Sequence, residues 1–169
     1  LTVAPNTKVN WKEIPITNSS YFLGASYTNG KFFLGSHGTP SYVSSDGFDW
    51  GAIPIRAQHI CYGNGVYVSS SGGTSAVSSD AFNWSSRSNT VNSRTISYGA
   101  GRFVLSGENG QIATSIDGVT WQECVSPLSQ KVFSSSYLNG QFVLGAGSRQ
   151  IAVSADGIIW TKSSAPMDV

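Results

Sequence analysis

Ser44-Ser45-Asp46-Gly47-Phe48-Asp49-Trp50 is the first of four closely similar heptapeptides in this chain. The other three end at Trp84, Trp121 and Trp160, and the set reads S-x-D-G-x-x-W, with Ala81 in the glycine position of the second copy. Self-similarity at a fixed period is typical of an architecture made of stacked copies of one supersecondary unit. The motif therefore predicts that its Asp and Trp residues belong to the framework.

A second anchor, Tyr-x-x-Gly, precedes each Trp at a nearly constant spacing and begins at Tyr27, Tyr62, Tyr98 and Tyr137. Between the two anchors lie short apolar runs such as Phe103-Val104-Leu105, which have the length of strands and not of helices. Asn-Gly and Asp-Gly steps separate the runs, and they favour hairpin turns because glycine reaches positive φ without steric cost. Each repeat is thus predicted to contain four antiparallel strands, and the chain almost no helix.

Four-stranded units of about 40 residues are typical of the blades of a β-propeller. On its S-x-D-G-x-x-W turns and its Tyr-x-N-G-x-F-V segments, the chain resembles the Asp-box (BNR-type) repeats of sialidase-like propellers, with one residue fewer between Asp and Gly. It resembles above all the propeller repeats of tail fibre and receptor-binding proteins of tailed phages. The resemblance covers residues 11–160 and implies an all-β fold, a small β-propeller of four four-stranded antiparallel blades.

The repeat boundaries predict one folded domain over residues 11–164, with an N-terminal extension at 1–10 and a C-terminal tail at 165–169. Its four repeats are expected at about 17–50, 51–84, 85–121 and 122–160. Segment 11–16 repeats the pattern of residues 50–55, so it is predicted to be an extra outer strand that joins the last blade and closes the ring. Because the chain starts at Leu1 without Met, we expect an excised domain or a processed product.

The composition argues against several classes of function. Only 11% of the 169 residues are charged and the net charge is +1, which gives no reason to expect nucleic acid as a partner. No apolar run approaches the length of a membrane-spanning helix, so membrane insertion is not expected. Cys61 and Cys124 are predicted to be free thiols on an inner and an outer strand, and they lack any metal-ligand spacing. The sequence therefore predicts neither a metal nor a cofactor.

The regularly spaced acids of the repeats invite a catalytic interpretation, but a turn role is favoured. An Asp in this position accepts backbone N–H groups within its own turn, and a Ser does likewise. Each Asp stands alone in its repeat, so no two of them converge on one site. We therefore assign a structural role to all eight repeated residues, namely Asp46, Trp50, Asp80, Trp84, Asp117, Trp121, Asp156 and Trp160, and predict no catalytic residue.

A glycan-active enzyme of the sialidase type is the first alternative. The resemblance to sialidases implies that such an enzyme would use a cluster of three Arg, a Tyr nucleophile with a Glu partner, and an Asp acid. Glycoside hydrolysis needs two carboxyl groups that face one bond. Outside the repeated turns, Glu108 is the acid expected on a binding loop, and such an enzyme would need an Arg near it.

Recognition is the favoured function, because repeat-to-repeat variation gathers in two kinds of segment. These are the turns between the second and third strands and the links between repeats, which share one face of a propeller. Variable polar loops on a constant scaffold are typical of a binding surface. The predicted ligand-binding residues are His37, Thr39, Arg56, His59, Arg94, Glu108, Asn109, Arg149 and Gln150.

The sequence thus predicts a non-enzymatic receptor-binding module of a phage tail fibre or spike. Its expected partner is a host cell-surface glycan or protein, and its expected location is the virion tail or the extracellular space. A homo-oligomer formed through flanking parts of a longer chain is also expected. A purely structural assembly module with no ligand is the second alternative.

Overall fold

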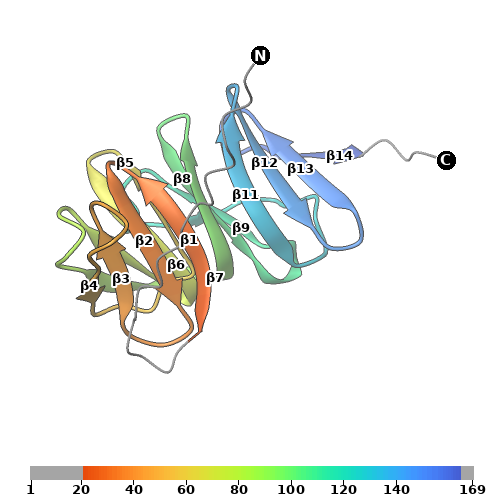
Figure 1. Cartoon of the computed structure of the whole chain (residues 1–169). Coiled ribbons are helices and arrows are strands. Elements are labelled where there is room, and N and C mark those ends of the chain that lie inside the picture. The colour runs from red at the N-terminus through yellow and green to blue at the C-terminus, as the bar shows by residue number, and fades with distance from the viewer. Residues whose placement is uncertain (1–20, 165–169) are drawn as a thin grey trace, which may run out of the picture.

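The computed structural model describes residues 21–164, and these form three antiparallel sheets of four, six and four strands (Figure 1). The first sheet consists, in order, of β1 (Phe22–Thr28), β2 (Lys31–Ser36), β3 (Ser41–Ser44) and β4 (Gly51–Ile53). The second has the order β10-β9-β8-β7-β6-β5 and contains β5 (His59–Gly63), β6 (Val66–Ser78), β7 (Ser85–Gly99), β8 (Arg102–Gly107), β9 (Ile112–Ser115) and β10 (Gln122–Glu123). The third consists of β11 (Val132–Leu138), β12 (Gln141–Ala146), β13 (Gln150–Ser154) and β14 (Thr161–Ser164).

The all-β prediction is confirmed, and the one helical element of the described residues is a 3-10 turn, η1 (Glu108–Gly110). The first and third sheets each correspond to one predicted repeat. Their registers agree closely: Tyr27 pairs with Phe32 in the first sheet, and Tyr137 pairs with Phe142 in the third. The predictions for residues 1–10, 11–16 and 165–169 lie outside the described residues.

The six-stranded sheet differs from the sequence prediction, because it holds two repeats without a break between them. Val66–Ser70 of β6 pair with β5, whereas Thr74–Val77 of the same strand pair with the start of β7. The turn between these two halves lies against the following link, where the Gly72 carbonyl accepts hydrogen bonds from Ser93 Oγ (2.9 Å) and Asn89 Nδ2 (3.4 Å). These contacts keep the link extended, so β7 runs from the outer strand of one repeat into the inner strand of the next.

Three apolar clusters fill the junctions between consecutive repeats. The first is centred on Phe33 and Tyr67, the second on Val68 and Phe103, and the third on Val104 and Phe142, among other residues. The innermost strands follow one another in space, because β1 contacts β5, β5 contacts β7, and β7 contacts β11. Each internal repeat thus buries one face against the repeat before it and the opposite face against the repeat after it.

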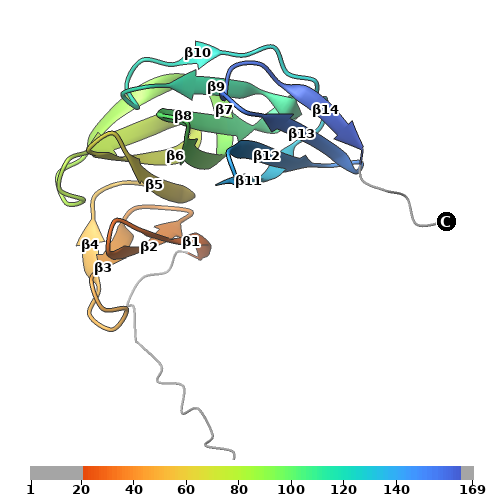
Figure 2. The ribbon, with the colours of Figure 1, turned by 90° about the horizontal axis from the view of Figure 1, so that it is seen from above.

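Seen from above, the three sheets form an open arc whose two ends, β1–β4 and β11–β14, stand apart (Figure 2). The closed four-blade ring expected from the sequence is therefore not formed by residues 21–164. The reason is geometric: each junction turns the chain through only part of a circle, and three junctions leave a gap. The predicted place of Trp11 in closure lies outside the described residues.

The remaining framework features concern cysteines, metals and membranes. Cys61 on β5 and Cys124 after β10 are both free thiols, as predicted, and burial raises the pKa of each. Within residues 21–164, no three His, Cys, Asp or Glu side chains gather as a metal site would require. In the same part of the chain, no helix has the length and apolarity needed to cross a membrane.

Candidate functional site

The four S-x-D-G-x-x-W turns have nearly the same hydrogen bonds. In the third copy, Asp117 Oδ1 accepts the backbone N–H groups of Val119 and Thr120, both at 2.8 Å, while Ser115 Oγ accepts the N–H of Gly118 at 2.9 Å. The first, second and fourth copies repeat all three bonds, each between 2.8 and 3.0 Å. The N–H donors lower the pKa of each of these four carboxyl groups, so all four are ionised at neutral pH. These turns use the Asp side chains internally.

The same turns share one face of the arc with the turns between first and second strands. Asn64, in the latter kind of turn, donates from Nδ2 to the carbonyls of Gly101 (3.0 Å) and Ile116 (2.8 Å) in the next repeat. Its Oδ1 accepts the hydroxyl of Tyr98 at 2.6 Å. We call this surface the turn face.

The repeated Trp residues have unequal surroundings. Trp50 and Trp84 donate from Nε1 to carbonyls of their own turns, at 3.1 and 2.9 Å. Trp121 reaches back to Ser75 Oγ of the preceding repeat at 3.2 Å, and Trp160 is the buried member of the set. The motif therefore places each indole, while the neighbouring repeat decides what the indole contacts.

The variable turns lie directly against the links between repeats, on a surface that we call the link face. A Cβ atom added to Gly107 would stand 1.9 Å from the Asn92 carbonyl oxygen, so turn and link backbones touch there. Gln111 Oε1 accepts the N–H of Asn92 at 3.1 Å, and Gln150 Oε1 accepts the N–H of Ser129 at 2.9 Å. The sequence did not single out Gln111, although its alignment with Gln150 one repeat later was available as a signal.

Glu108 is at the centre of a charged cluster on the link face. It begins η1, between β8 and β9, and its Oε1 lies 3.1 Å from Arg94 Nη1 and 3.2 Å from Lys131 Nζ. Partial burial works to raise the pKa of Glu108, but hydrogen bonds and charge interactions with Lys131 and Arg94 outweigh it and hold the pKa below its ordinary value. The cluster joins β7, η1 and the link before β11, and it carries one more positive charge than negative.

The structure places the other predicted residues in different environments. His37 is exposed and stacks on Tyr21 with ring centroids 4.7 Å apart, and Thr39, Arg56 and Arg149 are also exposed. Asn109 is exposed in η1 with a left-handed backbone (φ 54°).

Three predicted residues lie in strands and not in loops, and one of them is Arg94, within β7. His59 begins β5, where it is half-buried beside Gly24, and burial lowers its pKa. Gln150 begins β13 and binds Ser129. The sequence predicts loops at His59 and Gln150 because a short link and the first residue of the following strand look alike. It predicts a link at Arg94 because no local pattern indicates that β7 continues from one repeat into the next. Lys131 completes the charged cluster. The sequence predicts that it lies in a link, but it is not among the predicted ligand-binding residues.

The charges of the two faces have opposite signs. The link face of the described residues carries one carboxylate, Glu108, which contacts Arg94 and Lys131, and two further cations, Arg56 and Arg149. The turn face carries the four ionised turn aspartates and Asp49, against Lys31 and Arg102 at the starts of β2 and β8. A net charge of +1 therefore conceals a separation of charge that the composition alone does not reveal.

Comparisons with known proteins support the fold. No protein-family model matches the chain, and no curated protein does. Virginiamycin B lyase from Staphylococcus aureus superposes with a TM-score of 0.76 at 11% identity, covering 90% of this chain and 59% of that one. YCF48 bound to a D1 peptide gives a TM-score of 0.63 at 17% identity, covering 90% of this chain and 57% of that one.

Raptor from Chaetomium thermophilum gives a TM-score of 0.64 at 13% identity, covering 85% of this chain and 16% of that one. The described residues thus have a partial, propeller-like all-β fold. The chain spans less than two thirds of the length of these proteins. At such identities the likeness concerns the fold alone.

Proposed function

We propose that this chain is a non-enzymatic recognition module whose link face binds an acidic ligand on a cell surface, either a glycan or a protein. The observation that carries the proposal is the cationic link face, where Arg94 and Lys131 contact the one carboxylate, Glu108, and Arg56 and Arg149 are exposed in other repeats. Exposed guanidinium groups suit carboxylates and phosphates, because their planar fork can donate two parallel hydrogen bonds. The placement of these charges on variable turns and links supports a binding role.

The setting that we propose is a phage tail fibre or spike, or another extracellular receptor-binding protein. Its support is the resemblance of the S-x-D-G-x-x-W repeats to those of tail fibre propellers. Proteins of similar fold serve different purposes: YCF48 is seen with a D1 peptide, whereas the Staphylococcus aureus protein is named a lyase. The fold alone therefore does not identify the function, and the proposal depends on the chemistry of the link face.

The sialidase-type alternative has one observation in its favour, since Arg94 lies 3.1 Å from Glu108. However, Glu108 is the single carboxylate on the link-face turns and links of residues 21–164, whereas glycoside hydrolysis uses two. Its lowered pKa also keeps it ionised, which is unsuited to a general acid. Recognition therefore remains the better-supported function.

Binding of the purified chain to a glycan array and to whole host cells, at low and at physiological salt, tests the proposal. Arg56→Gln with Arg149→Gln is expected to weaken binding about three- to thirtyfold, because two exposed charges are lost. Binding is also expected to weaken as salt rises. Arg87→Gln with Lys162→Gln, both exposed on outer strands, removes equal charge away from the link face and should leave binding unchanged.

Equal losses in the two double variants would contradict a link-face site. If the link-face double variant alone loses binding to protein-free glycans, the ligand is a glycan. If protease treatment of the cells abolishes binding, the ligand is a protein. Release of sugar from the array by the wild-type chain would support the enzyme alternative instead.

A further inference from the structure

Each junction between repeats is built as a knob in a socket. The knob is one side chain of the second strand, and its three buried examples are Phe33, Val68 and Val104, at 1%, 0% and 0% exposed. The socket is the next repeat's face, formed by the repeated Tyr, Trp and second-strand residues. Val68 packs with Phe103 and Trp121, and a Cβ atom added to Gly118 in that socket would lie 2.4 Å from Val68 Cγ2.

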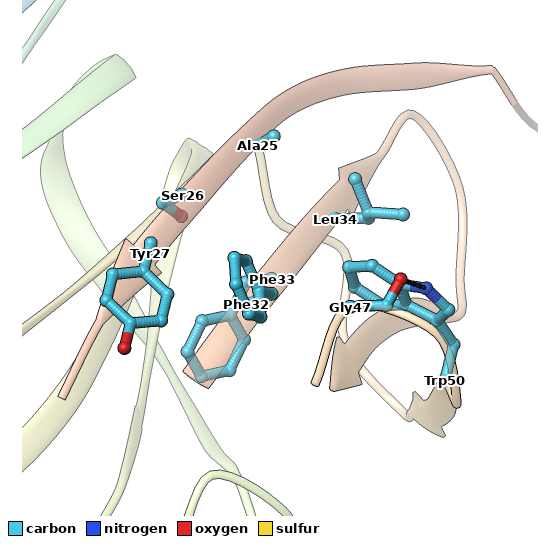
Figure 3. A pocket seen from close by; sticks show the side chains of 8 residues that line it. All are labelled: Ala25, Ser26, Tyr27, Phe32, Phe33, Leu34, Gly47 and Trp50. Carbon is cyan, nitrogen blue, oxygen red and sulfur yellow. Dashed lines mark hydrogen bonds between the residues drawn. The ribbon is translucent and has the colours of Figure 1, made fainter. Parts of the chain in front are cut away.

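The first repeat carries a complete socket that no described residue fills. A hollow of about 410 Å³ opens on its outer face, and Figure 3 shows Tyr27, Phe32, Leu34 and Trp50 around it. Phe32 is 37% exposed, whereas the equivalent Tyr67, Phe103 and Phe142 are 2%, 0% and 0% exposed. At the turn, a Cβ atom added to Gly47 would meet nothing closer than Phe32 at 3.8 Å, in contrast to the crowded Gly118.

The opposite end of the arc presents the matching knob. Val143 on β12 occupies the position of Phe33, Val68 and Val104, and it is 41% exposed. Val143 pairs with Val153 across the sheet, just as the buried knob Phe33 pairs with Val43. The arc thus ends in two complementary surfaces, which belong to end sheets that stand apart within one chain (Figure 2).

We propose that a second copy of this chain occupies the empty socket, with its β11–β14 sheet against the β1–β4 sheet and its Val143 in the hollow. The contact would continue the interface that already joins the repeats three times in each chain. A head-to-tail contact of this kind closes into a ring when the rotation fits. Two four-repeat arcs would give eight blades, within the range known for propellers.

The length of the chain allows this occupant. The arc covers 59% of the lyase chain and 57% of the YCF48 chain, so a second arc of the same size would supply more than the remainder of those chains. The socket and the knob are both apolar, and no charge stands among the hollow's lining residues. Apolar burial would therefore hold the junction together.

One position sets the expected tightness of the junction. The residue after the repeated Tyr is Gly63 or Gly99 at two internal junctions, where an added Cβ atom would stand 2.1 Å from Tyr98 or 2.0 Å from Tyr137. Leu138 has this position on β11, and it is 71% exposed. In the proposed dimer, Leu138 would crowd Tyr27 of the second copy and loosen the contact.

Sedimentation velocity and light scattering of residues 1–169 over a concentration series test the proposal. We expect a reversible dimer of twice the 17.9 kDa chain mass. Val143→Asp should weaken dimerisation about a hundredfold or more, because a charge would enter the apolar socket. Ile159→Asp is the control: Ile159 is an exposed apolar residue of the same repeat, and the equivalent position in the first repeat is already Asp49, so its dimer should persist.

Mixing two variants distinguishes this head-to-tail contact from any other dimer. Val143→Asp keeps the socket and Phe32→Asp keeps the knob, so each alone should be monomeric while their mixture recovers one good junction and dimerises. Leu138→Gly should tighten the wild-type dimer, whereas it would weaken a contact that merely used Leu138 as an apolar patch.

A wild-type chain that stays monomeric at all concentrations would overturn the proposal. A dimer that Val143→Asp leaves unaffected would also overturn it. So would a mixture of Val143→Asp and Phe32→Asp that stays monomeric although each variant has the wild-type circular dichroism spectrum.

Discussion

The turn face and the link face are made by the same four repeats, yet the turns of the first are nearly identical and those of the second differ from repeat to repeat. On the turn face, the four Asp side chains accept the same pair of backbone N–H groups at 2.8–3.0 Å. On the link face, the corresponding turns are a cis Thr39-Pro40 segment, the Gly72 turn, the 3-10 turn at Glu108, and a left-handed Ser148-Arg149 pair. A repeat can thus hold one face constant through local hydrogen bonds while the other face varies without loss of the fold.

The largest effect is expected at the Trp of the turn motif. Trp121→Ala removes an indole that packs in the second junction and donates to Ser75 Oγ, so it should lower the free energy of unfolding by about 3–5 kcal/mol. Arg149→Ala, at an exposed link-face position, should change it by less than about 0.5 kcal/mol. Urea unfolding followed by circular dichroism measures both, and equal losses would abolish the distinction between the faces.

A second prediction separates backbone strain from crowding on the turn face. Gly118 and Gly65 have similar left-handed φ angles of 73° and 82°, but only Gly118 faces a neighbour, Val68 Cγ2 at 2.4 Å from an added Cβ. Gly65→Ala should therefore cost about 1 kcal/mol for the left-handed backbone alone. Gly118→Ala should cost about 1–3 kcal/mol more, because it also overpacks the junction. Similar melting temperatures for the two variants would contradict the tight junction.

The turn hydrogen bonds themselves are tested by Asp117→Ala, which should cost about 1–2 kcal/mol at neutral pH. Backbone N–H donors, first that of Thr120, lower the pKa of Asp117 in the folded chain. A lowered pKa gives stability that is present above the unfolded value of about 3.9 and is lost as the pH falls through the folded pKa. The stability difference between the wild type and Asp117→Asn should accordingly shrink below about pH 4, and a constant difference down to about pH 2 would contradict the role of the ionised carboxylate.

The smallest effect is expected for the link-face cluster. Glu108→Gln removes the charge that Arg94 and Lys131 share, but the group is partly exposed and screened, so stability should fall by at most about 1 kcal/mol. The same change frees two cations and should strengthen binding of an acidic ligand, measured by calorimetry or on the glycan array. A large loss of stability would instead make the cluster part of the framework.

The repeat, its strands and its turns can be predicted from the sequence alone, because they depend on interactions within a few residues. Ser115, Asp117 and Gly118 satisfy their turn locally, and Tyr98 pairs with Phe103 through a hairpin of the same repeat. Such features recur wherever the motif recurs. The all-β class and the division into constant and variable faces were therefore predictable from the sequence.

The contacts between repeats, by contrast, depend on how the repeats pack against one another. Phe32 and Phe103 hold the same place in their repeats, yet one is exposed and the other is buried, because burial depends on whether a preceding repeat covers that face. The ion pairs of Glu108 with Arg94 and Lys131 join residues from separate segments, and no local pattern announces them. The open arc likewise follows from the small rotation at each junction, a property of packed sheets that no single repeat encodes.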